Sequence, residues 1–152
     1  MAFRKATINA QFQTAIQAEL EPGERVETCT LTQSGPTPWL TGAVGILMML
    51  VLGMRYYFIA VTDRRVLFMR ASLMTVKPKG LAWADQRGAG RVFEVDADAA
   101  LWSHFKYERP GDGEVTRFNV HRIWRDELRG VLSAMTTRTT GTLPAPPPSV
   151  PA

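Results

Sequence analysis

The side chains best suited to nucleophilic or acid–base chemistry in this sequence belong to one cysteine and two histidines, Cys29, His104 and His121. Cys29 lies in an expected β-strand, where a free cysteine usually packs as a small apolar residue. His104 falls on the polar side of another expected strand, and His121 stands where a helical pattern begins, so a solvated or capping role suits both. No metalloprotease, hydrolase, phosphate-loop or dinucleotide-binding motif is present. We therefore expect no catalytic residue, no metal site, no cofactor, and a function that is not enzymatic.

Length and composition favour one domain in a reducing compartment. The chain has 152 residues, of which 45% are apolar and 21% are charged. This length can bury one core of ordinary size. The single cysteine excludes an intramolecular disulfide and a cysteine-based zinc site, and it is typical of a cytoplasmic environment.

Charge is distributed unevenly along the chain. The net charge is +4, but residues 53–91 contain eight lysines and arginines against two aspartates, whereas residues 92–120 contain three basic residues against six acidic ones. A basic region suits an anionic partner, and the same charges also serve solubility. The basic residues form no recognition helix and are not interleaved with an aromatic platform, so no nucleic-acid partner is expected.

An uncharged segment runs from Thr28 to Met54, and its last part, Trp39–Met54, is almost wholly apolar. Such a run can insert into a membrane, associate with a second copy of the chain, or fold back as an internal helix. Trp39 and Arg55-Tyr56-Tyr57, at its two ends, are typical of interfacial anchors. The candidate membrane-inserting residues are Trp39, Leu40, Ile46, Leu47, Met48, Met49, Leu50, Val51 and Leu52.

The length and position of this run argue against a single membrane crossing. Sixteen helical residues rise about 24 Å, which is short of a hydrocarbon core of about 30 Å. A crossing would also leave the first expected strand on one side of the membrane and the remaining strands on the other, so the sheet could not close. We therefore expect the run to enter and leave the same face of a membrane.

Basic residues follow the apolar run closely and could meet an anionic lipid headgroup. Each lysine or arginine near an anionic leaflet adds about 1 kcal/mol of attraction. For Arg64 and Arg65 the alternatives are an exposed hairpin position or an ion pair with Asp63. The candidate headgroup-binding residues are Arg55, Arg64, Arg65, Arg70, Lys77 and Lys79.

Periodicity predicts a mainly β fold, barrel-like or α+β, with helices at both ends. Residues 4–20 and the chain from His121 onward have helical apolar stripes, while the final residues are rich in proline and without periodicity. Trp83, Trp102 and Trp124 are expected in the core rather than in an aromatic ligand cage. Alternating or β-rich segments predict seven strands, at Arg25–Thr32, Tyr56–Val61, Arg65–Arg70, Leu81–Ala84, Arg91–Ala97, Leu101–Glu108 and Glu114–Val120.

Three features together resemble the bacterial pleckstrin-homology-like domains of the GRAM type: Glu21–Val26 before the first strand, Tyr57–Leu67 across the second hairpin, and the closing helix. The resemblance implies a bent seven-stranded antiparallel sheet capped by a C-terminal amphipathic helix. It also places the apolar run between the first two strands, a loop that many eukaryotic relatives turn toward lipid headgroups. The expected organisation is an N-terminal amphipathic helix at 1–20, the domain at 21–136 with the apolar insertion 39–54, and a disordered tail at 137–152.

Two functions follow from these features. The first is a membrane-associated binding or scaffold module on the cytoplasmic face, with the lipid surface as its partner. The second is a soluble cytoplasmic protein-interaction domain that forms homo-oligomers through the apolar segment or binds another protein through it. The sequence does not identify the lipid or protein ligand.

Overall fold

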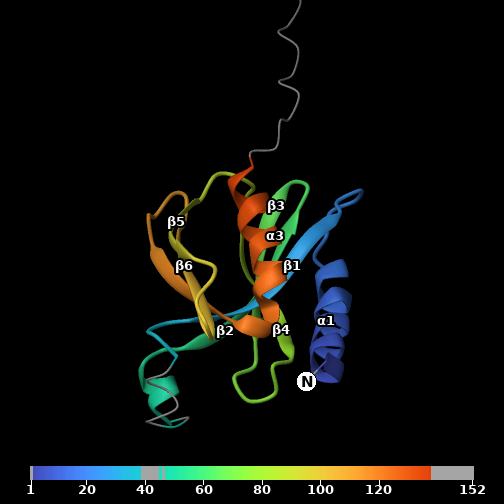
Figure 1. The fold of residues 1–152 in the computed structure, drawn as a ribbon. Helices are drawn as coiled ribbons and strands as arrows, with labels where there is room; N and C mark the ends of the chain where they lie inside the picture. Colours follow the sequence, from blue (N-terminus) through green and yellow to red (C-terminus); the bar gives the residue numbers. More distant parts are fainter. Residues whose placement is uncertain (1, 39–44, 46, 138–152) are drawn as a thin grey trace, which may run out of the picture.

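A computed structural model describes residues 2–38, 45 and 47–137 of the chain (Figure 1). Two helices flank seven strands, and a short 3₁₀ helix, η1, joins the last strand to the last helix. The elements are α1 (Ala2–Gln17), β1 (Val26–Ser34), β2 (Arg55–Thr62), β3 (Arg65–Ala71), β4 (Pro78–Gln86), β5 (Arg91–Asp96), β6 (Trp102–Glu108), β7 (Val115–His121), η1 (Arg122–Trp124) and α3 (Arg125–Thr136).

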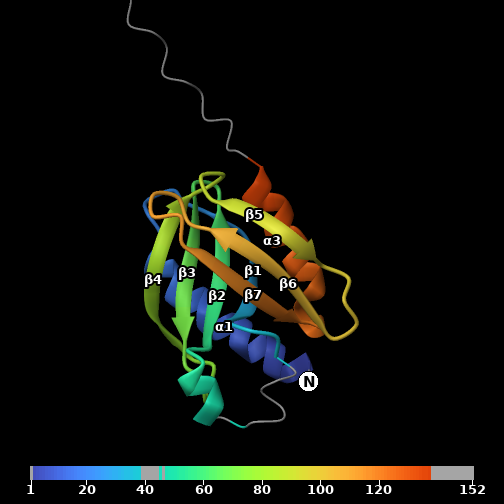
Figure 2. The same cartoon turned by 90° about the vertical axis from the view of Figure 1, so that its left-hand side faces the viewer.

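The seven strands form one open antiparallel sheet in the order β4-β3-β2-β1-β7-β6-β5, so the prediction of a mainly β fold with terminal helices is confirmed. β1 lies in the middle and pairs with β2 on one side and with β7 on the other. β2 pairs with β1 along its whole length, whereas β7 pairs only with the C-terminal end of β1. At that end, Gln33 lies opposite Tyr56 of β2 and opposite Asn119 of β7. The two halves of the sheet are therefore joined at a single strand, and Figure 2 shows them crossing at an angle.

Helix α1 covers the outer face of the sheet, which we define as the face carrying Leu31 and its β2 partner Phe58. Phe12 of α1 stacks on Phe58 with ring centroids 4.2 Å apart, and both rings are fully buried. Ile16, one helical turn later, is also fully buried. The apolar stripe expected in the N-terminal segment is thus the surface that packs on the sheet.

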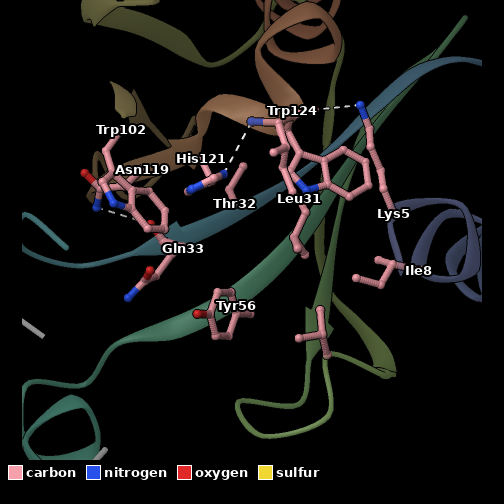
Figure 3. Close-up of a pocket in the computed structure, with 12 residues that line it drawn as sticks. Lys5, Ile8, Leu31, Thr32, Gln33, Tyr56, Trp102, Asn119, His121 and Trp124 are labelled. Atoms are coloured by element: carbon pink, nitrogen blue, oxygen red, sulfur yellow. Dashed lines mark hydrogen bonds between the residues drawn. The ribbon is translucent and has the colours of Figure 1, made fainter. Parts of the chain in front are cut away.

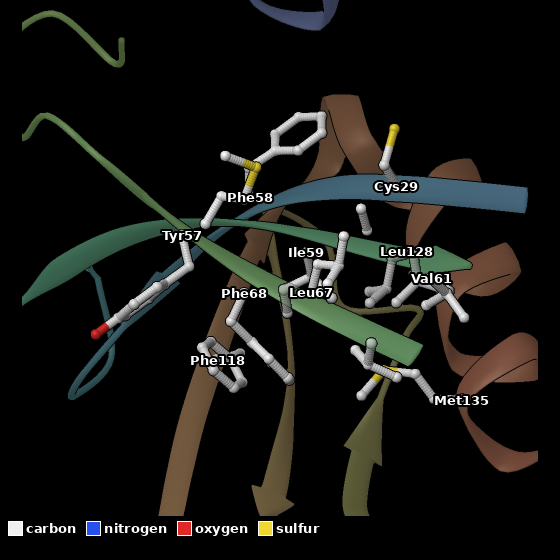
Figure 4. Packing of buried hydrophobic residues seen from close by; sticks show 14 of the residues in the cluster. Cys29, Tyr57, Phe58, Ile59, Val61, Leu67, Phe68, Phe118, Leu128 and Met135 are labelled. Atoms are coloured by element: carbon white, nitrogen blue, oxygen red, sulfur yellow. The ribbon is translucent and has the colours of Figure 1, made fainter. Parts of the chain in front are cut away.

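Helix α3 covers the opposite, inner face. Leu128, Val131 and Met135 recur at helical spacing and are buried, and Figure 4 shows Leu128 and Met135 on the same side of β2 as Val61.

β2 and β3 are buried almost throughout rather than at alternate positions. Helix α1 covers the outer face, and the inner face is covered by α3 together with Phe118 of β7 and Tyr107 of β6, which pack on Tyr57 and Phe68. Strands covered on two faces carry near-continuous apolar runs, as Phe58–Val61 does here.

Strand boundaries differ from prediction in the second half of the chain. β6 begins at Trp102, and Leu101, expected on its buried face, is 49% exposed. The expected alternation of β5 also fails at Val95, which is 48% exposed. The register of β5 against β6 shifts between Phe93 and Asp96, and Glu94 there has a positive φ of 48°. A bulge of this kind inserts an extra residue and breaks the period of two.

Candidate functional site

The described part of the apolar run forms a short exposed helix between β1 and β2. Residues 47–51 are helical, and we call them the apolar helix. A turn at residues 52–53 follows the helix, and Gly53 there has a φ of +67°, a left-handed conformation that glycine adopts without strain. The exposed fractions are 77% for Leu47, 62% for Leu50 and 74% for Val51. An internal core helix, one of the three expected alternatives, does not fit this exposure.

The chain leaves and re-enters the sheet at neighbouring positions on either side of the apolar helix. Ser34, the last residue of β1, lies opposite Arg55, the first residue of β2, and its hydroxyl donates to the Arg55 carbonyl at 3.2 Å. Met54 is 98% buried against Gly35, and the Gln33 side-chain amide contacts its sulfur at 3.6 Å. The residues that flank the segment are thus fixed side by side in one sheet.

Three cations surround the base of the apolar helix. Arg55, Arg70 and Lys79 line a surface hollow of about 340 Å³ together with apolar residues from the helix and from the β3–β4 loop, Leu50, Gly53, Met54 and Leu73. The three cations come from the starts of β2 and β4 and the end of β3. In both Figure 1 and Figure 2 the apolar helix lies at the same end of the sheet as the β3–β4 loop. We call this region the apolar end.

The cations of the apolar end have no ionic partner in the part of the chain that the structure describes. Arg55, Arg70, Lys77 and Lys79 are all exposed, and none lies within ion-pair distance of a carboxylate there. The β3–β4 loop, between Ala71 and Pro78, adds the apolar side chain of Met74, which is 74% exposed. Free positive charge and exposed apolar surface therefore lie together.

The structure does not bring Arg64 and Arg65 to this region. Both lie at the β2–β3 turn, at the other end of the hairpin. The Arg65 Nη2 donates to Glu24 Oε2 at 2.7 Å, and its Nε donates to Glu24 Oε1 at 3.0 Å. The Glu24 side chain is fully buried, and its pKa is lowered to about 2, mainly by the Arg65 guanidinium. Arg65 therefore has a structural role, with Glu24 rather than Asp63 as its partner.

A separate cavity of about 240 Å³ opens on the outer face, beside Lys5 and Ile8 in the N-terminal half of α1 (Figure 3). This cavity could not be predicted from the sequence, because its walls come from elements far apart in the chain. Its residues include two of the three tryptophans that were expected in the core. The lining is Lys5, Ile8, Leu31, Thr32, Gln33, Tyr56, Val76, Trp102, Asn119, His121, Ile123 and Trp124.

Two of the three residues singled out for chemistry, Cys29 and His121, have structural partners among the described residues. The His121 Nδ1 accepts from the Ile123 backbone N–H at 3.4 Å, which confirms its capping role at η1. Cys29 is buried, as expected, and burial raises the pKa of its thiol to about 11, so the thiol is protonated at neutral pH. Among the described residues no group of three or more histidine, cysteine and carboxylate side chains is placed to hold a metal ion.

Some expectations fall on residues that the structure does not describe. Trp39, Leu40 and Ile46 of the candidate membrane-inserting set lie outside the described residues, as do residues 138–152 of the tail. No helix within the described ranges combines the length and apolar character needed to cross a membrane. The sequence matches no protein-family model, and no curated protein matches it.

Proposed function

We propose that this chain is a non-enzymatic, membrane-associated binding module that lies on an anionic cytoplasmic leaflet. One observation carries the proposal: the exposed apolar helix stands beside Arg55, Arg70 and Lys79, which have no carboxylate partner among the described residues. Such a surface is complementary to a lipid interface, where apolar side chains enter the acyl boundary and cations meet phosphate groups.

The path of the chain supports attachment from one face. Ser34 and Arg55 are paired in the same sheet, so the segment between them leaves and returns at one point. A helix that dips into one leaflet satisfies this constraint, whereas a single crossing would separate β1 from β2. Leu47, Leu50 and Val51 would then lie at the depth of the headgroup and acyl boundary, with the cations above them.

The finer fold assignment is also a proposal. A seven-stranded antiparallel sheet followed by an amphipathic helix supports a pleckstrin-homology-like domain. The apolar helix falls between β1 and β2, the position that the resemblance gives to the lipid-facing loop. Helix α1 would be an addition to a minimal domain of this type.

Self-association is the second candidate, because exposed apolar residues also suit a second copy of the chain. The charges weigh against it. A two-fold interface centred on the apolar helix would bring Arg55, Arg70 and Lys79 of both copies close together, and like charges placed together across an interface are unfavourable. An anionic surface removes this repulsion, so the membrane is the better partner.

Sedimentation with lipid vesicles tests the proposal. The wild-type chain should pellet with vesicles that contain phosphatidylglycerol and much less with vesicles of phosphatidylcholine alone. Replacing Leu47, Leu50 and Val51 with aspartate should abolish pelleting, because each apolar side chain loses about 1.5–3 kcal/mol of burial when it is fully inserted. All three are exposed in the structure, so the fold should survive, as circular dichroism can verify.

A matched variant controls for the added negative charge. Val95, Leu101 and Val115 are about as apolar and are each close to half exposed, but they lie in β5, in the β5–β6 loop and in β7. Replacing these three with aspartate changes the net charge equally and should leave more vesicle binding than the first variant does. Equal loss of vesicle binding in both variants would mean that binding depends on net charge and not on the apolar helix. Self-association would be favoured if the wild-type chain does not bind vesicles and sediments as a discrete oligomer.

A further inference from the structure

The outer face of the sheet is only partly covered by α1, and the uncovered part forms the floor of the 240 Å³ cavity. The β1–β2 and β1–β7 pairings place Tyr56 and Asn119 opposite Gln33, so all three side chains share one face. Leu31 precedes Gln33 by two residues and shares that face, as His121 does with Asn119. Phe12 of α1 packs on the same face at Phe58, and Ile8, one turn earlier, forms a wall of the cavity.

Most of the cavity wall is apolar. Ile8, Leu31 and Val76 contribute aliphatic side chains, and Trp102 and Trp124 contribute rings. An apolar cavity of about 150 Å³ is enough to bind benzene, so 240 Å³ admits a ligand of about ten non-hydrogen atoms.

Gln33 is a buried polar group without a full set of partners. It is 98% buried, and the contact of its amide nitrogen with the Met54 sulfur, at 3.6 Å, is weak. Its side-chain oxygen accepts no hydrogen bond within the described residues. Asn119 beside it differs, because its amide donates to the carbonyls of Gln33, Gly35 and Pro36. Buried polar groups are normally paired, so the Gln33 carboxamide is available to a ligand in this cavity.

His121 supplies a second polar group. Its Nδ1 accepts from the Ile123 backbone, which leaves the proton of the neutral ring on Nε2. Burial and the nearby Arg122 lower the pKa of His121, so the ring is neutral at pH 7. The only cation lining the cavity is Lys5 among the described residues, and its Nζ lies 2.5 Å from Glu127 Oε1 and donates to the Ile123 carbonyl at 2.7 Å. The cavity therefore offers hydrogen bonds without a free charge.

We propose that this cavity binds a small uncharged amphiphile, with an apolar body and one terminal amide or alcohol group that pairs with the Gln33 carboxamide and the His121 Nε2–H. This proposal does not depend on membrane attachment. Burying an unpaired charge is strongly unfavourable, so a neutral head group fits these walls better than an ionic one.

Octanamide, with ten non-hydrogen atoms and a neutral head, is a direct probe. Titration of the full-length, isotope-labelled chain should give saturable NMR shifts for the Gln33 side-chain amide and for residues lining the cavity. Gln33→Leu should weaken binding about tenfold without lowering the melting temperature, because the substitution removes a poorly paired buried amide. Met74→Gln, an exposed change in the same loop as Val76, is the matched control and should bind octanamide normally.

Two further measurements keep the proposal open to refutation. Ile8→Trp should fill the cavity and abolish the saturable shifts while vesicle sedimentation stays unchanged, which separates this site from the apolar end. Heptyltrimethylammonium carries the same seven-carbon alkyl chain with a charge and no hydrogen-bonding group, and it should bind at least tenfold more weakly. Absence of saturable shifts in the wild type, or equal octanamide affinity in wild type and Gln33→Leu, would overturn the proposal.

Discussion

The two ends of the β2–β3 hairpin hold the same kinds of residue in opposite circumstances. At the turn end, Arg65 binds the buried carboxylate of Glu24 through two nitrogens, and the Thr62 hydroxyl donates to the same carboxylate at 2.6 Å. At the apolar end, Arg55 and Arg70 are exposed and have no carboxylate partner within the described ranges. Identical guanidinium groups thus serve the fold at one end and remain available to a partner at the other.

The comparison shows that partners, rather than charge or proximity in the sequence, decide what a cation can do. Arg64 and Arg70 are only six residues apart in the sequence, yet they lie at opposite ends of β3, whose six residue steps span about 20 Å. A flat anionic surface that meets Arg55 and Arg70 would therefore be out of reach of Arg64. Screening over about 8 Å at physiological salt also limits any long-range contribution from the turn end.

The largest expected contrast concerns stability. Arg65→Ala leaves the buried Glu24 carboxylate without its main partner and should lower the free energy of unfolding by about 3 kcal/mol. Arg70→Ala removes an exposed, unpaired side chain and should change it by less than about 0.5 kcal/mol. Chemical denaturation of both variants measures the difference. Similar losses of unfolding free energy in the two variants would contradict the assignment of a structural role to Arg65 and of a free side chain to Arg70.

Acid should weaken the turn end and spare the apolar end. The pKa of Glu24 is lowered from 4.5 to about 2 in the folded chain, so its contribution to stability is complete above pH 4.5 and is lost as the pH falls toward 2. Glu24→Gln should therefore reduce the melting temperature at pH 7 and flatten its decline between pH 4.5 and 2. Thermal melts across this window test the sign, and a decline as steep as that of the wild type would assign acid sensitivity to other carboxylates.

Most of the fold follows from local patterns in the sequence. The strand segments were recognisable because period-two alternation is a property of a few neighbouring residues. The pattern failed where tertiary structure overrode it, as at Val95, where a bulge shifts the register. Residues 57–61 show only a continuous apolar run, and burial on both faces became evident once α1 and α3 were placed.

The candidate site was only partly visible in the sequence. The apolar run and the nearby Arg55, Arg70 and Lys79 could be named, because adjacency in the sequence coincides with adjacency in space around one hairpin end. Which cations are paired could not be foreseen, since Glu24 meets Arg65 from 41 residues away. The outer cavity gave no signal either, because it needs α1, β1, β2 and β7 together. The nearly unpartnered Gln33 amide is recognisable only from the three-dimensional contacts.

Removing one cation from the apolar end should weaken vesicle binding moderately. Arg70→Gln should weaken binding to phosphatidylglycerol-containing vesicles by about 1 kcal/mol, or about fivefold, and Arg55→Gln and Lys79→Gln should act similarly. Raising the salt concentration should reduce the difference between wild type and variant, because the attraction is screened. Vesicle sedimentation over a salt series measures both effects, and an effect independent of salt would point to a contact other than lipid charge.

We expect the smallest effect for Arg64→Gln, which removes one positive charge at the turn end rather than at the apolar end. The Arg64 guanidinium lies 3.6 Å from Glu21, and both side chains are about half exposed. An exposed pair of this kind contributes about 0–1 kcal/mol, so Arg64→Gln should shift stability only slightly. It removes the same charge as Arg70→Gln but about 20 Å from the apolar end, so vesicle binding should stay within twofold of wild type. Vesicle sedimentation of Arg64→Gln and Arg70→Gln therefore separates local contact from net charge. Equal weakening of vesicle binding in both variants would mean that the lipid responds to the overall charge of the chain rather than to the cations of the apolar end.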